Sequence, residues 1–177
     1  MKKLILLLIP TLLVACGETP PEGSIDSPNK NSNQVYDFSK LFSTISGKSV
    51  SVIEARSLKP GDKVIVTGKV MGSRNPFVTG RASFIIGDPA KLASCDLDEG
   101  DGCKTPWDVC CEPSKVIASS TLNIQVLDAE GKVVKTSLKN IEGLTELAMV
   151  TVQGTVSHGS SAQSMSINAE IISVKKK

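Results

Sequence analysis

The pattern most informative about the fold is found in residues 63–72, KVIVTGKVMG. Apolar and polar residues alternate along it and most apolar positions are β-branched, which is the pattern of a strand with one buried face. Gly68 and Gly72 interrupt the alternation. Because glycine inside a strand commonly marks a bulge or a tight bend at a barrel corner, we predict that this strand curls strongly.

Four further segments have strand patterns. They are ASFIIGD at 82–88, TLNIQVL at 121–127, MVTVQGTV at 149–156 and MSINAEIISV at 165–174. The segment 149–156 repeats the first strand, with an interior glycine at the same offset. Residues 128–132 predict a hairpin-like turn, 133–138 its return arm, and 140–147 a linker with room for one helical turn.

This order of elements, with a first strand bent by glycine, resembles the OB-fold, a five-stranded Greek-key barrel. The resemblance covers residues 58–174. It implies an all-β OB-like domain at 58–177, with an insert at 89–120 between the second and third strands. The roughly 140 residues that follow the N-terminal segments have the usual size of a single domain.

Residues 35–57 predict an extension of this domain that contains a helix and a strand. Apolar residues at 35, 38, 41, 42 and 45 suit one face of a short amphipathic helix that starts near Tyr36. The next segment, SVSVIEA at 49–55, alternates as a strand does. We therefore expect a short N-terminal helix packed against one end of the barrel.

The chain begins with the pattern of an export signal. Two lysines precede the apolar run 4–15, which is too short to span a bilayer because a spanning helix needs about 20 apolar residues. The run ends Leu-Val-Ala-Cys, which resembles the lipobox of bacterial lipoproteins, in which the cysteine is acylated and becomes the first mature residue. The resemblance implies a signal peptide at 1–15 and lipid on Cys16. The alternative is an ordinary secretory signal that ends in a chance cysteine.

Residues 16–34 predict a flexible tether between this anchor and the folded domain. Gly, Pro, Ser, Asn and charged residues make up nearly all of the segment, and such a composition cannot bury enough apolar surface to offset chain entropy. Gly17 replaces the aspartate that favours retention in the inner membrane of enteric bacteria. We expect an exported lipoprotein held at the outer membrane or the periplasmic face.

The charge balance argues against a nucleic-acid partner. The chain has 20 Lys and Arg against 18 Asp and Glu, and the loss of Lys2 and Lys3 with the signal leaves 18 against 18. A net charge of zero with no basic run between residues 35 and 174 does not fit a protein that binds phosphates without sequence preference. Single-strand binding by the barrel face stays an alternative, supported only by Phe77, Phe84 and a few basic residues.

CDLDEGDGCKTPWDVCC, residues 95–111, contains four of the five cysteines and the only tryptophan. An even number of cysteines in an exported chain predicts a disulfide framework. Neighbours Cys110 and Cys111 are disfavoured as partners because that ring is strained, so we expect one of them to pair with Cys95 and the other with Cys103. The insert would then be held by two disulfides.

Other chemistries for this segment stay open. The cysteine spacing lacks the C-x2-C pairs of common zinc sites, and the absence of C-x-x-C argues against a thiol oxidoreductase. Calcium at Asp96, Asp98 and Asp101 is a weaker alternative, since the spacing departs from known loops and no distal glutamate follows. Trp107, with Asp108, is either an anchor for a partner or a side chain packed over the bridges.

The run DGCKTPWDVCCE, residues 101–112, is similar to one found in uncharacterised bacterial lipoproteins with an OB-like domain, where TPWD-x-CCE follows an acidic loop that contains cysteine. The resemblance implies a fold and no known activity. The single histidine, His158, leaves no site built from several histidines, and no Gly-x-Ser-x-Gly elbow accompanies it. We treat His158 as an exposed loop residue.

From these patterns we expect a lipid-anchored module of the cell envelope without catalytic activity or cofactor. Residues 95–111 would form its recognition surface for another envelope protein or a small ligand. The alternative function is metal or ligand handling by the cysteines and acids of the same segment.

Overall fold

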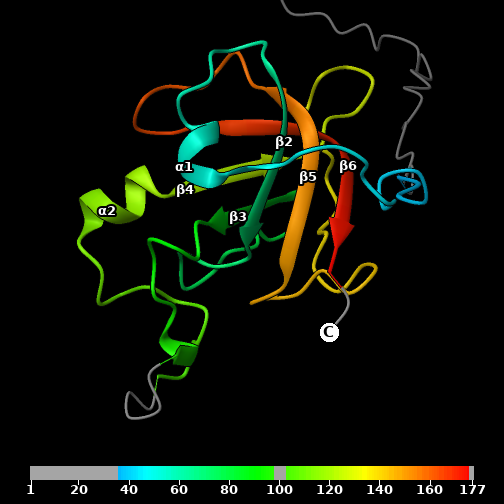
Figure 1. Ribbon diagram of the computed structural model, residues 1–177. Helices are drawn as coiled ribbons and strands as arrows, with labels where there is room; N and C mark the ends of the chain where they lie inside the picture. Colours follow the sequence, from blue (N-terminus) through cyan, green and yellow to red (C-terminus); the bar gives the residue numbers. More distant parts are fainter. Residues whose placement is uncertain (1–35, 98–102, 176–177) are drawn as a thin grey trace, which may run out of the picture. The chain divides into compact units, whose positions relative to one another are not determined.

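The computed structural model describes residues 36–97 and 103–175 (Figure 1). The predicted signal peptide, Cys16 and the predicted tether lie outside the described residues. In the part of the chain that is described, no helix has the length and apolar character needed to cross a membrane.

The described residues form one sheet in which five strands close into a barrel. The strands are β1 (Val50–Ser51), β2 (Lys63–Lys69), β3 (Ser83–Gly87), β4 (Thr121–Gln125), β5 (Met149–Val156) and β6 (Ser166–Val174). Their order is β1-β2-β3-β4-β6-β5, and β5 pairs again with β2 over the whole length of β2. The pair β4–β6 is parallel, whereas the other pairs around the barrel are antiparallel. The predicted five-stranded barrel is therefore confirmed.

Alternation along the strands fills the barrel interior. In β2 and β5 every second residue is buried, as the sequence pattern predicts. The interior is a single cluster of aliphatic side chains with one fully buried ring, that of Phe84. Members with no exposed surface include Val66, Phe84, Ile86, Ile124, Val152, Ile167 and Ile172. Burial of such side chains stabilises the fold by about 1.5–3 kcal/mol each.

Two glycines allow strands to approach more closely than any side chain would permit. A Cβ on Gly68 would lie 3.0 Å from Val52 Cγ2 and 3.1 Å from the carbonyl oxygen of Gly87. A Cβ on Gly154 would lie 2.2 Å from the carbonyl oxygen of Asn168, where the register of β5 against β6 shifts. The repeated glycine of the first and fourth long strands thus marks the places where the barrel bends.

The predicted helix at the start of the domain is wrong. Residues 39–41 form a turn, in which Asp37 accepts a hydrogen bond from the Ser39 amide at 2.9 Å. The chain then runs beside β6, where the Ile172 amide donates to the Leu41 carbonyl at 2.7 Å and Phe42 forms a parallel bridge to Ile172. The apolar residues cover the core from this edge, so tertiary pairing outweighs the helical spacing.

The predicted strand at 49–55 is also largely wrong. Only β1 is extended, and the short helix α1 (Val52–Ala55) follows it directly. Ser51 Oγ accepts a hydrogen bond from the Glu54 amide at 3.2 Å, and Glu54 accepts one from the Ser51 amide at 2.8 Å. The Ser-x-x-Glu pattern of this capping box is present in the sequence and predicts a helix N-terminus, but the alternation of residues 49–55 favoured a strand.

Two smaller predictions after β4 need correction. The hairpin-like turn forms, and the return arm pairs at its start through the Leu127–Val133 bridge and the Val134 amide, which donates to the Val126 carbonyl at 3.0 Å. The rest of 133–138 is not a strand, and its Val134 and Leu138 join the core. Residues 140–147 contain turns and no helix, with Asn140, Glu142 and Leu147 at positive φ. The insert, by contrast, contains a short 3-10 helix η1 (Cys95–Leu97) and the helix α2 (Ser114–Ser119).

Replacement of Gly154 tests the close approach of β5 and β6. Gly154→Ala would place a methyl group against the Asn168 carbonyl, so we expect a loss of about 1–3 kcal/mol in the free energy of unfolding. Gly159→Ala is the matched control, because a Cβ there meets nothing closer than 3.9 Å, and it should change stability by less than about 0.5 kcal/mol. Equal stability of the two variants in chemical denaturation would contradict this account.

Candidate functional site: the cysteine-bearing insert

The insert leaves the barrel and returns to it at one point. The Asp88 amide, just after β3, donates to the carbonyl of Ser120, just before β4, at 2.9 Å. The Asp88 side chain is only 3% exposed, and its carboxylate accepts from the amides of Ala90 at 3.0 Å and Ile53 at 3.3 Å. One carboxylate therefore organises the start of the insert and the N-terminus of α1.

A second hydrophobic cluster attaches the insert to the barrel. Its buried members are Met71, just after β2, and the insert residues Leu92 and Val109. Val116 and Ile117 of α2 pack against them. The Gly72 amide adds a hydrogen bond to the carbonyl of Trp107 at 3.3 Å. The insert thus has its own small core, and one member of this core, Met71, comes from the segment just after β2.

An ion pair joins the barrel wall to η1. Lys69 Nζ lies 3.0 Å from Asp96 Oδ2 and donates to Ser94 Oγ at 2.9 Å, with the Lys69 side chain 13% exposed. Burial raises the pKa of Asp96, but hydrogen bonds from Ser94 and Lys69 and the charge of Lys69 outweigh it and leave that pKa below its usual value. The Asp96 carboxylate is therefore already paired with the Lys69 ammonium group.

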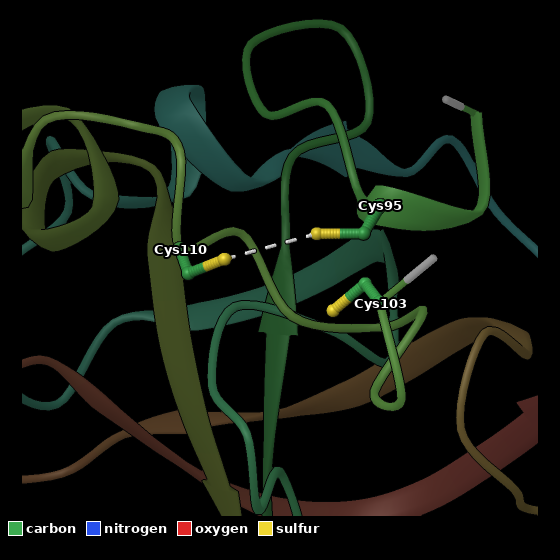
Figure 2. Close-up of side chains that lie close together, drawn as sticks. All are labelled: Cys95, Cys103 and Cys110. Atoms are coloured by element: carbon green, nitrogen blue, oxygen red, sulfur yellow. Dashed lines mark hydrogen bonds between the residues drawn. The ribbon is translucent and has the colours of Figure 1, made fainter. Parts of the chain in front are cut away.

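Three of the four insert cysteines meet beside η1 (Figure 2). The Sγ atoms of Cys95, Cys103 and Cys110 all lie within 4.8 Å of one another, and those of Cys95 and Cys110 are 4.0 Å apart. Cys95 and Cys103 are half-buried and Cys110 is exposed, as is Cys111. The Cys95–Cys110 separation is about twice the 2.05 Å of a disulfide bond, so the predicted pairing stays a prediction.

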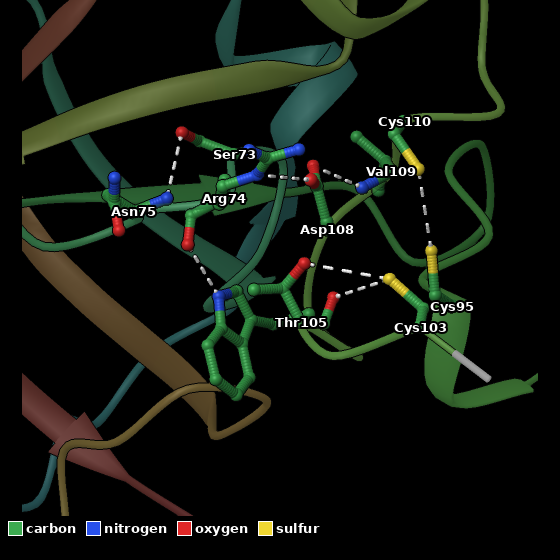
Figure 3. A network of polar contacts seen from close by, with 10 residues as sticks. Ser73, Arg74, Asn75, Cys95, Cys103, Thr105, Asp108, Val109 and Cys110 are labelled. Carbon is green, nitrogen blue, oxygen red and sulfur yellow. Dashed lines mark hydrogen bonds and ion pairs between the residues drawn. The ribbon is translucent and has the colours of Figure 1, made fainter.

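Backbone hydrogen bonds fix the segments that hold these sulfurs. The Cys95 amide donates to the Asp108 carbonyl at 3.1 Å, and the Asp96 amide donates to the Pro106 carbonyl at 2.8 Å. Near Cys103, the hydroxyl and the carbonyl oxygen of Thr105 each lie 3.5 Å from Sγ (Figure 3). The convergence of the sulfurs is therefore a consequence of the loop's backbone.

Trp107 and Asp108 serve the insert's attachment to the loop after β2. The Trp107 indole N–H donates to the Arg74 carbonyl at 2.8 Å. Asp108 is 8% exposed, accepts from the Val109 amide at 2.9 Å and lies 3.9 Å from Arg74 Nε (Figure 3). Trp107 is half-buried, so of this predicted pair it is the one with side-chain surface for a partner.

Leu97 is the large hydrophobic side chain of the described residues with the most exposed surface. It is 68% exposed at the end of η1, compared with 38% for Ile53 and 40% for Val78. Its neighbour Asp96 is held by Lys69, so the backbone that presents Leu97 is fixed to the barrel. Asp98 and Asp101, named in the weaker calcium alternative, lie outside the described residues.

The barrel exterior offers few aromatic contacts. Phe84 is fully buried and Phe77 is 8% exposed, so neither ring is open for base stacking. Where β3, β4 and β6 adjoin, the outward side chains form uncharged pairs: Ser83 with Asn123 at 2.8 Å and Gln125 with Asn168 at 2.8 Å. His158 is exposed in the turn after β5, as predicted.

Sequence reasoning missed the residues that attach the insert. Lys69 is the last residue of an alternating strand, which places its side chain outside the barrel, but nothing in the sequence shows that Asp96 is its partner. Met71, Leu92 and Val109 have no periodic pattern that would reveal a shared cluster. Ser94-x-Asp96 ahead of a short helical turn was the one local signal available.

Comparisons with models of protein families, with curated proteins and with solved structures find no match to this chain. The resemblance of residues 101–112 to OB-like lipoproteins and the lipobox at Cys16 are therefore predictions that rest on the sequence pattern alone.

Loss of the Lys69 contact tests how the insert is held. Lys69→Met keeps the aliphatic stem and removes the charge, which leaves Asp96 and Ser94 without their cation. We expect the insert to lose about 1–3 kcal/mol of local stability, with cleavage by protease within residues 92–112 roughly tenfold faster.

The matched control is Lys139→Met, which breaks the Lys139–Glu146 ion pair in the loop before β5. It should leave cleavage of the insert unchanged. If both variants are cut in the insert at the wild-type rate, Lys69 does not hold it.

Proposed function

We propose that this chain is a lipid-anchored binding module of the cell envelope, in which an OB-like barrel presents the insert 95–111 as a recognition surface. The observation that carries the proposal is the exposed Leu97 on a segment that the barrel holds in place. The module works by binding and not by catalysis, and its partner is another envelope protein or a small envelope ligand.

The strand order supports the OB-like assignment. Counted from β2, the barrel runs first, second, third, fifth, fourth and back to the first strand, with the third and fifth strands parallel. A Greek-key path of five strands in a partly open barrel is the OB-fold arrangement. In the present chain the connection between the second and third strands is the long one, and it carries the cysteines.

The way the insert is attached supports recognition. A hydrophobic cluster, an ion pair and the Trp107 indole contact bind the described parts of the insert to the barrel, so a partner would meet Leu97 and Trp107 on preformed segments. Interface hot spots are enriched in tryptophan, and large exposed apolar groups beside such anchors add buried area. Leu97 and Trp107 are the contact residues of the proposal, and the Asp108 carboxylate, which faces Arg74, belongs to the same attachment of the insert.

The predicted disulfides belong to this proposal as one means of holding the insert. They would join Cys95 and Cys103 to Cys110 and Cys111, and closure of a loop of about 15 residues stabilises by roughly 3 kcal/mol. The barrel face offers less support for single-stranded nucleic acid, because the rings of Phe77 and Phe84 are buried in the core.

The lipid anchor is tested by Cys16→Ser. We expect the wild-type chain, expressed in a bacterial host, to sediment with membranes and to show the mass of an acylated chain that starts at Cys16. Cys16→Ser should lose the acyl mass, and the folded domain should move to the soluble fraction. Cys111→Ser is the control and should remain with the membrane. A wild-type chain without acyl mass would contradict the proposal.

The recognition surface is tested by site-specific photo-crosslinking. A photoreactive amino acid at Leu97 should capture one discrete envelope component in intact cells. The same group at Val78, which is exposed on the loop after β2 but lies outside the insert, should not capture it. Equal capture from both positions, or none from Leu97 while the chain is folded and anchored, would rule out the insert as the recognition surface.

A further inference from the structure

The three converging sulfurs of the insert have a geometry that a thiophilic metal ion can use. In a tetrahedral zinc site with Zn–S bonds of about 2.3 Å, neighbouring sulfurs are about 3.8 Å apart. The Sγ atoms of Cys95 and Cys110 are 4.0 Å apart, and Cys103 Sγ completes a group within 4.8 Å (Figure 2). Such a triangle of sulfurs requires only small side-chain movements to accept one ion.

We propose that Cys95, Cys103 and Cys110, as thiolates, bind one Zn²⁺ ion. The proposal goes beyond the recognition function, and it does not depend on the identity or existence of a partner for Leu97. The predicted disulfides use the same sulfurs, so a given sulfur can serve only one of these two states.

The chemistry of the donors selects zinc over hard cations. Thiolates are the preferred ligands of Zn²⁺, whereas Ca²⁺ and Mg²⁺ require oxygen ligands. The nearby described carboxylates have other roles, because Asp96 pairs with Lys69, and Asp108 accepts from the Val109 amide and faces Arg74. The three sulfurs are therefore the donors offered to an ion at this place.

The loop holds these donors before any ion arrives. The hydrogen bonds from the Cys95 and Asp96 amides connect the start of η1 to the turn that contains Pro106 and Asp108. Val109, next to Cys110, is 1% exposed in the insert's hydrophobic cluster, which anchors the third donor. A preformed set of ligands binds metal more tightly because less chain ordering opposes binding.

A hydrogen bond to Cys103 and access from solvent also suit a metal. The Thr105 hydroxyl lies 3.5 Å from Cys103 Sγ and can donate to a thiolate, which helps to stabilise its charge. Cys110 is exposed and its two partners are half-buried, so an ion can enter from solvent. Three protein thiolates leave the fourth position of a tetrahedral ion to water or an external ligand.

The decisive experiment measures zinc on the mature chain. The protein is purified with a thiol reductant, stripped with chelator, returned to Zn²⁺ and analysed by native mass spectrometry and metal analysis. We expect one zinc per chain, slower proteolysis of the insert when zinc is present, and sulfur-to-metal charge-transfer absorption when Co²⁺ replaces zinc. Failure of the reduced, folded chain to bind zinc would overturn the proposal.

Single substitutions assign the site. Cys95→Ser should weaken zinc binding by roughly a hundredfold or more and reduce the Co²⁺ absorption, because loss of a ligand costs more than the 10–100-fold loss seen for outer-shell partners. Cys111→Ser is the matched control, and it should keep one zinc per chain. Circular dichroism verifies that both variants retain the barrel. Zinc binding unaffected by Cys95→Ser, or abolished by Cys111→Ser, would overturn the three-thiolate assignment.

Discussion

The constraint on which this structure depends is that β2 pairs along both of its edges. It pairs with β5 from Lys63 to Lys69, and its other edge meets β1 at Val66 and Thr67 and β3 at Lys69. Because β5 returns to pair with β2, the sheet closes on itself, and closure requires the strands to tilt and the sheet to curve. Gly68 and Gly154 allow the close approaches at the bend, since a Cβ on Gly154 would collide with the Asn168 carbonyl and a Cβ on Gly68 would crowd Val52 and Gly87.

The end of β2 also determines where the insert lies. Lys69, the last residue of β2, forms the ion pair with Asp96. Met71, two residues later, is a buried member of the insert's hydrophobic cluster. The end of β2, where the barrel bends, therefore also provides the contacts that hold the cysteine-bearing insert. A surface built in this way combines a rigid scaffold with a variable loop, which is the usual location of binding residues.

The sulfur chemistry of the insert connects its stability to its surroundings. Two disulfides would hold the loop permanently, whereas a zinc ion would hold it in a way that depends on metal supply. In either state the sulfurs lie close to η1, which presents Leu97. Disulfide formation or zinc binding at these sulfurs would therefore affect the position of Leu97 at the proposed recognition surface.

The sequence by itself determined the barrel. Alternation and glycine placement revealed five strands, close to their true bounds, because period-two burial is a local property of each strand. It also located the insert and its cysteines. Tertiary contacts were needed to show that residues 41–43 run beside β6, that α1 replaces a strand, and that Lys69 pairs with Asp96. These depend on contacts between residues far apart in the chain, and the distances between the three sulfurs depend on backbone hydrogen bonds that no local pattern encodes.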